Sequence, residues 1–536
     1  MKTNLPLGDA LFAHRKTLGA LLAVVLLTNT FVVVARSGDS SGGGSLVADG
    51  GGAVADEEGS LDGGDEPGVV GNTPSAGSGA GSALPSTSPS TDVRKGKPGQ
   101  VIKGKGTIPF GINGNELSVV YYWKGDQTKS SPFLAGTGQD GNVDEGQAFH
   151  TLIKYLNDNP EGEWMGFKYN LHGWKLKPQV LEAGKGDDQI RAAERISKEI
   201  KPFAAVSSHG SISAYVCPVL ADAGIFNIST YDLDFGLQKR TNGYCLPAGI
   251  AFDGQADLTE AYMRTHKNTP YINAAGQKEE RVYGVLYAEY PGMVNAGPKI
   301  VERLRKAGLN IPKDGVATVD PDLTTAGRQQ PTVIAKFRGA GVNTIIAPES
   351  GSLITFTSAS DGAGYRPDYY VWPCSGQDSL GMTRLYSKTQ WERASGLTCY
   401  DENLNADLTN DDKARRTQWY KVYQEANPGS EPPAPTSLVY QSLLPLVVGI
   451  THAGRDLTIE RVRAGWSRFK PYRYDAIKGR TNNPGSIMVT LNAPDGSQVG
   501  DAAKVYWDPT TTTPGNAAPG TYAFPENRRY ARGARF

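Results

Sequence analysis

The sequence predicts an α/β protein whose folded part forms two lobes. From about Leu117 onward, short apolar segments of strand type alternate with longer segments of helical spacing. No internal repeat is evident in this part of the chain. About 430 residues follow the N-terminal low-complexity region, and a chain of that length normally divides into more than one hydrophobic core.

One complete βαβ unit is predicted near the middle of the chain. Ala204–Val206 and Ile225–Ile228 are short apolar runs typical of buried parallel strands, and between them Ala214–Ala223 is small and apolar before Gly224 ends it. The Ser-rich turn Ser207–Ser213 therefore follows the carboxyl end of a strand. Ligands of open α/β sheets bind at such ends, and free N–H groups at the start of the next helix favour an anion.

The remaining elements extend this pattern on both sides. Leu117–Trp123 is predicted to be the first strand, and Val143–Asn157 and Asp188–Ile200 are predicted to be helices. A second series of elements follows, with strands at Arg281–Ala288, Thr344–Ala347 and Asp368–Trp372 and helices at Ala296–Ala307, Thr332–Ala340 and, later, Ser437–Ile450. That last apolar run contains Pro445 and is too short to span a bilayer, so we expect a core helix.

The βαβ unit also carries a family resemblance. Its serines Ser208, Ser211 and Ser213, the helix end Asp222-Ala223-Gly224-Ile225 and the strand Ile228-Ser229-Thr230 are similar to the first wall of the ligand cleft in one family. This family comprises the type I extracytoplasmic solute-binding proteins of ABC importers for branched-chain amino acids, amides and urea. The resemblance runs from about Leu117 to Trp466.

The resemblance implies a periplasmic-binding-protein type I fold. Each of its two lobes is a mostly parallel sheet flanked by helices, and a hinge joins them. The first lobe would span about 115–250 and the second about 254–400, each with returning segments, within a domain at 101–536. The chain would cross between lobes near Ala251–Gly254, near Glu349–Gly351 and after Cys399, and the helix Ser437–Ile450 would return to either lobe.

The ligand residues follow from the same resemblance. They are expected at strand ends of both lobes: Trp123, Ser208, His209, Ser211, Ser229, Thr230, Tyr231 and Tyr290. Relatives that bind amino acids place an acid after a strand of the second lobe, but no acid directly follows Asp368–Trp372, so Glu349 and Asp378 are the nearest substitutes. Helix capping by the serines, packing by the aromatic residues and surface positions for the acids remain open alternatives.

The four cysteines lack the paired spacing of a zinc site. Outside the cytoplasm an even number favours two local disulfides, Cys217 with Cys245 and Cys374 with Cys399, although four cysteines allow three pairings and buried free thiols are an alternative.

The N-terminal region has the composition of an export signal followed by a tether. Residues 1–36 combine basic residues with the apolar run Leu18–Ala35, which is either a retained membrane anchor with a cytoplasmic N-terminus or a signal peptide cleaved after Val33-Val34-Ala35. Residues 37–100 are rich in Gly, Ser and Pro and are expected to be disordered. A linker of this kind favours a tether at the extracytoplasmic face of the membrane, and a secreted protein results if the signal is cleaved.

The resemblance implies a solute-binding protein that captures a small polar solute, such as an amino acid or amide, and delivers it to an ABC permease. Formal charge is balanced at 55 basic and 55 acidic residues, so no nucleic-acid partner is expected. No cofactor or metal site is indicated, and His150 and His172 are isolated. A surface sensor or scaffold of the same fold is an alternative. An extracytoplasmic hydrolase at Ser208-His209 is another, although no G-x-S-x-G motif is present.

Overall fold

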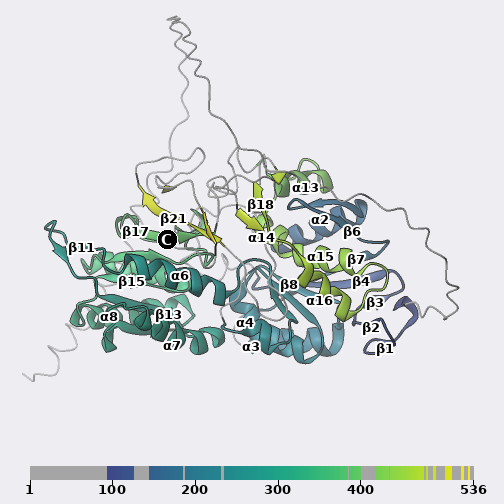
Figure 1. The fold of residues 1–536 in the computed structure, drawn as a ribbon, viewed down its shortest axis with the longest axis horizontal. Coiled ribbons are helices and arrows are strands. Elements are labelled where there is room, and N and C mark those ends of the chain that lie inside the picture. Colours follow the sequence, from purple (N-terminus) through teal and green to yellow (C-terminus); the bar gives the residue numbers. More distant parts are fainter. Residues whose placement is uncertain are drawn as a thin grey trace, which may run out of the picture. The chain divides into compact units, whose positions relative to one another are not determined.

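A computed structural model describes two large sheets with helices on both faces of each (Figure 1). The described residues are 93–125, 144–184, 187–230, 234–378, 380–383, 385–399, 415, 417–433, 435–475, 479–480, 487–489, 501–509, 521–523 and 529–531. This confirms the predicted α/β class with two mostly parallel sheets.

The first sheet has six strands within the described residues, and all its pairings except that of β3 with β4 are parallel. In spatial order they are β10 (Cys245–Pro247), β9 (Phe226–Ser229), β8 (Ala204–Ser207), β4 (Glu116–Trp123) and β3 (Ile112–Asn113), with β7 (Lys175–Glu182) paired to β4. The side chains of β4 alternate between the two faces, so Val119 and Tyr121 enter one core while Val120 and Tyr122 enter the other.

Helices cover both faces of this first sheet. On the face of Tyr121 lie α2 (Glu145–Asp158), α13 (Gln418–Ala426), α14 (Thr436–Ser442), α15 (Leu444–Ala453) and α16 (Ile459–Arg468). On the opposite face lie α3 (Asp187–Arg195), the π-turn Ile196–Ile200 that continues it, and α4 (Gly210–Asp222). The helical segment 418–468 therefore returns to the first lobe.

The second sheet has eight strands within the described residues. They are β14 (Val316–Val319), β13 (Tyr283–Ala288), β15 (Thr344–Ile346), β16 (Asp368–Val371), β17 (Ala394–Thr398), β21 (Asp501–Asp508) and β22 (Thr521–Ala523), with β23 (Arg529–Ala531) also on β21. The first five are parallel, whereas β21 joins β17 in antiparallel register. A late segment for which no sequence pattern predicted a position thus completes this sheet.

Helices also flank the second sheet on both faces. On one face lie α8 (Leu323–Gly339) and α9 (Gly351–Gly362), and on the other lie α6 (Phe252–His266) and α7 (Pro291–Lys306). Shorter described helices are α5 (Leu237–Arg240), α10 (Leu380–Thr383) and α11 (Lys388–Trp391), with 3-10 turns at Val93–Lys95 and Lys313–Gly315.

Both lobes also contain small antiparallel sheets of two or three strands. They are β1 (Val101–Ile102) with β2 (Gly106–Thr107), β5 (Glu161–Trp164) with β6 (Phe167–Asn170), β11 (Tyr271–Ile272) with β12 (Lys278–Glu279), and β18 (Tyr472–Asp475) with β19 (Gly479–Arg480) and β20 (Ile487–Val489).

Three expectations need correction. No crossing occurs near Glu349–Gly351, because β15, α9 and β16 all belong to the second lobe. The helix predicted to begin at Thr332 begins at Leu323, where the Asp322 side chain accepts hydrogen bonds from two backbone amides of the first turn. The predicted helix Ser437–Ile450 is divided into α14 and α15 just before Pro445, whose ring disfavours a continuous helix.

Both predicted disulfides are present, each between cysteines that are neighbours in the sequence. Cys217 is joined to Cys245 and Cys374 to Cys399, with Cα atoms 5.9 and 5.3 Å apart. Within the described ranges no helix combines the length and the apolar character needed to cross a membrane. The predicted anchor at residues 1–36 and most of the predicted linker lie outside those ranges.

Candidate functional site

A buried carboxylate lies at the carboxyl edge of the first sheet. Glu145 is in the first turn of α2, and its Oε2 accepts hydrogen bonds from the Tyr121 hydroxyl on β4 at 2.5 Å and the Ser208 hydroxyl after β8 at 2.7 Å. Its Oε1 lies 2.6 Å from Nε2 of His209. The side chain of Glu145 is 7% exposed and that of His209 is 29% exposed. The buried Glu145 carboxylate thus holds the partly exposed His209 ring at the edge of the sheet.

The surroundings of Glu145 favour its ionised form. Burial alone would raise the pKa of this carboxyl group, but the charge of His209 and the hydrogen bonds from His209, Tyr121 and Ser208 outweigh burial and lower the pKa below its ordinary value. A position in the first turn of a helix also favours a negative charge. Glu145 therefore acts as a fixed anion that orients three donors.

Part of the predicted turn is bonded internally. The amide of Ser208 donates to the Tyr121 hydroxyl at 3.2 Å, and the amide of His209 donates to the Ser207 hydroxyl at 3.1 Å. The Ser208 hydroxyl donates to Glu145 rather than to His209, which is not the arrangement of a nucleophile with its general base. Two of the amides that we expected to face an anion are thus already used.

Two polar groups at the same edge have no partner among the described residues. Nε1 of Trp123, at the end of β4, and Oγ1 of Thr230, just after β9, are buried and form no hydrogen bond within that part of the chain, and both residues are 7% exposed. A buried polar group without a partner costs free energy, so each of these two groups requires a water molecule or a bound molecule as its partner. In the sheet, β8 lies between β4 and β9, so the two groups flank the turn that carries His209.

The other residues predicted for this lobe lie partly inside and partly outside the described part of the structure. Ser229 ends β9 and is buried. Ser211 lies in the first turn of α4, but its side chain is outside the described part of the structure, as is all of Tyr231. The Ser213 hydroxyl accepts from Asn227, whose side chain also accepts from the Tyr122 hydroxyl, so Ser213 belongs to a core network on the opposite face of the sheet.

In the second lobe, Glu349 binds backbone amides. Its carboxylate accepts from the amides of Ala288 at 3.2 Å, Gly351 at 2.6 Å and Ser352 at 3.1 Å, so it joins the end of β13 to the start of α9. Burial raises the pKa of Glu349, and the hydrogen bonds from Ser352, Gly351 and Ala288 offset this only in part. Both oxygens have partners within the fold.

Asp378 has a comparable position beside a disulfide. Its Oδ2 accepts from the amides of Cys374 and Cys399 at 3.0 and 3.1 Å and from the Thr398 hydroxyl at 2.9 Å. The residue is fully buried, and burial raises its pKa. Asp378 thus fixes the two ends of the Cys374–Cys399 bridge.

Tyr290 and Gln377 complete the carboxyl edge of the second sheet. Tyr290 precedes Pro291, the first residue of α7, and packs against both cores of the lobe. Gln377 is fully buried; it accepts from the Trp372 amide at 3.0 Å and donates to the carbonyls of Ala347 and Glu349. Sequence reasoning missed Gln377, because the two chain segments that it joins are far apart in sequence.

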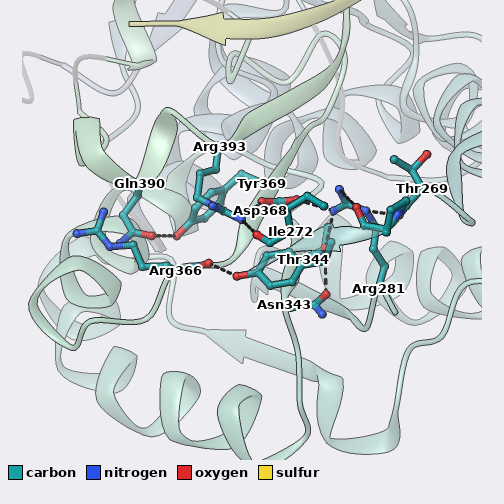
Figure 2. A network of polar contacts seen from close by, with 12 residues as sticks. Thr269, Ile272, Arg281, Asn343, Thr344, Arg366, Asp368, Tyr369, Gln390 and Arg393 are labelled. Carbon is teal, nitrogen blue, oxygen red and sulfur yellow. Dashed lines mark hydrogen bonds and ion pairs between the residues drawn. The ribbon is translucent and has the colours of Figure 1, made fainter. Parts of the chain in front are cut away.

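A second polar cluster, at the amino edge of the same sheet, has a different character (Figure 2). Asp368, at the start of β16, lies 2.8 Å from Nη1 of Arg281 and 2.6 Å from Nη2 of Arg393. The two arginines also donate to the carbonyls of Thr269 and Ile272, which bracket the start of the β11–β12 hairpin. This network therefore holds the hairpin against the sheet, at the edge opposite to Glu349.

No group of three or more potential metal ligands is found among the described residues. No protein-family model matches the chain, and no curated protein matches it. Solved structures do match it, at low sequence identity.

Three of these structures have TM-scores of 0.50 or 0.51. One is the fatty acid ABC transporter substrate-binding protein from Thermomonospora curvata, with a TM-score of 0.51, 13% identity and coverage of 79% of this chain and 94% of that one. Another is a solute-binding protein of an ABC transporter from Rhodopseudomonas palustris BisB5 in complex with 3,4-dihydroxybenzoic acid, with a TM-score of 0.50, 11% identity and coverage of 78% and 98%. The third is an ABC transporter substrate-binding protein from Aeropyrum pernix, with a TM-score of 0.51, 9% identity and coverage of 78% and 96%. At these identities the likeness is one of fold, and it confirms the two-lobed type I solute-binding fold.

Proposed function

We propose that the protein is an extracytoplasmic solute-binding protein that captures a small organic acid at the strand ends of its lobes and hands it to an ABC permease. The observation that carries this proposal is the pair of unpartnered buried groups, Trp123 Nε1 and Thr230 Oγ1, on either side of His209. The two native disulfides agree with an extracytoplasmic location.

The hydrogen-bond donors of Trp123, Thr230 and His209 indicate which class of solute would bind. An indole N–H can only donate a hydrogen bond, and a threonine hydroxyl can donate as well as accept. His209 uses Nε2 toward Glu145, which leaves Nδ1 of a partly exposed ring for a ligand. A carboxylate or carbonyl oxygen is an acceptor that suits each of these three kinds of group.

Three buried acids near the two carboxyl edges are poorly placed for an ammonium group. Glu145 accepts three hydrogen bonds from side chains, and both oxygens of Glu349 are bonded to backbone amides. Asp378 is fully buried; its Oδ2 accepts hydrogen bonds beside a disulfide, whereas its Oδ1 forms none among the described residues. We therefore assign Glu349 to the fold rather than to the ligand, and because Asp378 has no surface that an ammonium group could reach, we expect a solute without an α-amino group. Two of the structural neighbours carry the names of an aromatic acid and a fatty acid, which agrees with this class.

A thermal-shift screen of carboxylates, amides, amines and amino acids tests the proposal, because a solute that binds only the native state raises its melting temperature. We expect carboxylates to give the clearest rises. The hits are then titrated against Thr230→Val and Trp123→Phe, each of which should weaken binding by about 1.5–3 kcal/mol through the loss of one hydrogen bond to a charged group.

Thr265→Val is a suitable control, since its hydroxyl lies in an exposed stretch of α6 and donates to the Tyr262 carbonyl. This control should leave solute affinity unchanged. Because Thr230→Val removes an unpartnered group, it should not lower the free energy of unfolding. A library without any hit for the folded protein, or hits whose affinity is unchanged in Thr230→Val and Trp123→Phe, would contradict the proposal.

A further inference from the structure

Exposed lysines gather on one face of the first lobe, at the amino edge of its sheet. Three lie on the segment of residues 93–107, and three lie on β7 and at the end of the π-turn; together they form what we call the basic face: Lys95, Lys97, Lys103, Lys175, Lys177 and Lys201. No acid occurs between Val93 and Asn115. The whole chain is electrically balanced, so this is a local feature.

Specific contacts hold the parts of the basic face together. The guanidinium of Arg94 lies 5.0 Å from the ring centroid of Trp174, which fixes the start of the 93–107 segment beside the start of β7. A groove of about 590 Å³ is bordered by Pro98 of that segment, by Lys177 and by Lys201. Two of the six lysines, Lys177 and Lys201, therefore line the groove itself, and the others lie on the chain segments that adjoin it.

Few of these charges are neutralised. Within the described residues, Lys177 forms one long ion pair with Glu116, at 3.6 Å between exposed side chains, and none of the other five lysines of the basic face forms an ion pair. Glu460, an acid beside the 93–107 segment, accepts hydrogen bonds from Thr107. An excess of positive charge thus remains for an external partner.

The basic face also has apolar components. Phe110, Ile112 and Ile200 line the groove next to its lysines, and Val101, between Lys97 and Lys103, is 71% exposed. In addition, the buried hydroxyl of Ser118 at the groove has no hydrogen-bond partner within the described ranges. Clustered lysines with exposed apolar groups are typical of surfaces that lie on an anionic bilayer.

We propose that the basic face docks the first lobe onto an anionic phospholipid surface, with a headgroup in the groove. The face begins directly after the part of the sequence that predicts an export signal and a tether, which places it in the chain segment nearest to a membrane anchor. A single weak membrane signal gives reversible binding, and a polybasic patch adds a second. The proposal does not depend on the identity of the captured solute.

The test measures lysine accessibility in the full chain on vesicles. The protein is mixed with or reconstituted into vesicles of neutral phosphatidylcholine, or of the same lipid with about 30% phosphatidylglycerol, and acetylation of each lysine is followed by mass spectrometry. We expect the lysines of the basic face to react at least about threefold more slowly on anionic vesicles, and protection to vanish near 1 M salt, where the Debye length is about 3 Å. The exposed Lys278 and Lys313 of the second lobe should not change.

Variants make the test specific. The triple variant Lys95→Gln, Lys97→Gln, Lys103→Gln should remove the protection of Lys175 and Lys177, because each lysine near an anionic surface contributes about fivefold to binding.

The matched control Lys278→Gln, Lys313→Gln should keep the protection. Equal reactivity on neutral and anionic vesicles, or equal protection of Lys278 and Lys313, would overturn the proposal. Protection by inorganic phosphate or by a soluble polyanion without any effect of vesicles would also overturn it, in favour of a site for free anions.

Discussion

Replacing Glu145 by glutamine tests whether a buried anion orients the edge of the first lobe. The carboxylate accepts three hydrogen bonds and its side chain is 7% exposed. Hydrogen bonds to a charged group contribute about 1.5–3 kcal/mol each, against about 0.5–1.5 kcal/mol for neutral groups. The amide can still pair with the two hydroxyls, because these can rotate to accept. We therefore expect Glu145→Gln to lower the free energy of unfolding by about 1–3 kcal/mol at pH 6.

The lowered pKa of Glu145 also predicts how the stability difference between wild type and Glu145→Gln changes with pH. The pKa of Glu145 is lowered in the native state by His209 and by the donors around it, in spite of burial. A carboxyl group with a lowered pKa stabilises the fold above its unfolded pKa, and this stabilisation is lost as the pH falls through the native pKa. The difference between wild type and Glu145→Gln should therefore shrink below about pH 4.5, the ordinary value of the group.

Urea denaturation between pH 6 and pH 3 measures this difference directly. Glu302→Gln is a control, because Glu302 is a surface residue of α7 that pairs with Lys306, and it should cause no measurable change. The same loss of stability at pH 6 and pH 3, or no loss at either pH, would refute the assignment of Glu145 as a buried anion.

Three further changes probe the second lobe. Asp368→Asn should cost about 2–4 kcal/mol in urea denaturation, because it leaves two partly buried arginines without their shared anion, whereas the exposed Asp314→Asn should cost nothing measurable. Glu349→Gln should cost about 1–3 kcal/mol by removing acceptors of backbone amides, and solute affinity should persist; lost affinity in a protein of normal stability would instead make Glu349 a ligand residue. Replacing Cys374 and Cys399 by serine should cost about 3–4 kcal/mol, and peptide mapping without reductant should recover this bridge, whereas other linked pairs would contradict the pairing.

Much of the fold could be predicted from local patterns. The strands β8 and β9 and the helix between them are encoded by two short apolar runs and a terminating glycine, so their order and approximate bounds agree with the structure. The return of β21 to the second sheet could not be foreseen, because an antiparallel strand added at an edge depends on a partner about a hundred residues away. The false crossing near Glu349 arose because an acid at a strand end is equally compatible with a connection between lobes and with a helix start inside one lobe.

The site was predictable only in part. Ser208 and His209 stand out in the sequence, but their partner Glu145 is 64 residues from His209 and has the ordinary pattern of an acid in a first helical turn. The backbone amides around Glu349 leave no sequence signal at all, because every residue except proline carries one. Sequence patterns therefore located the edge of the sheet, whereas the direction of each side chain required the structure.

The most direct test of the central claim is a calorimetric titration with a matched pair of solutes. The pair consists of the carboxylate that binds most tightly in the screen and its α-amino derivative, measured on the same protein preparation. Because the carboxylates of Glu145 and Glu349 are bonded within the fold and Asp378 is fully buried, we expect the amino derivative to bind at least about tenfold more weakly, a difference of about 1.4 kcal/mol. Tighter binding of the α-amino derivative would contradict the account and restore an amino acid as the solute.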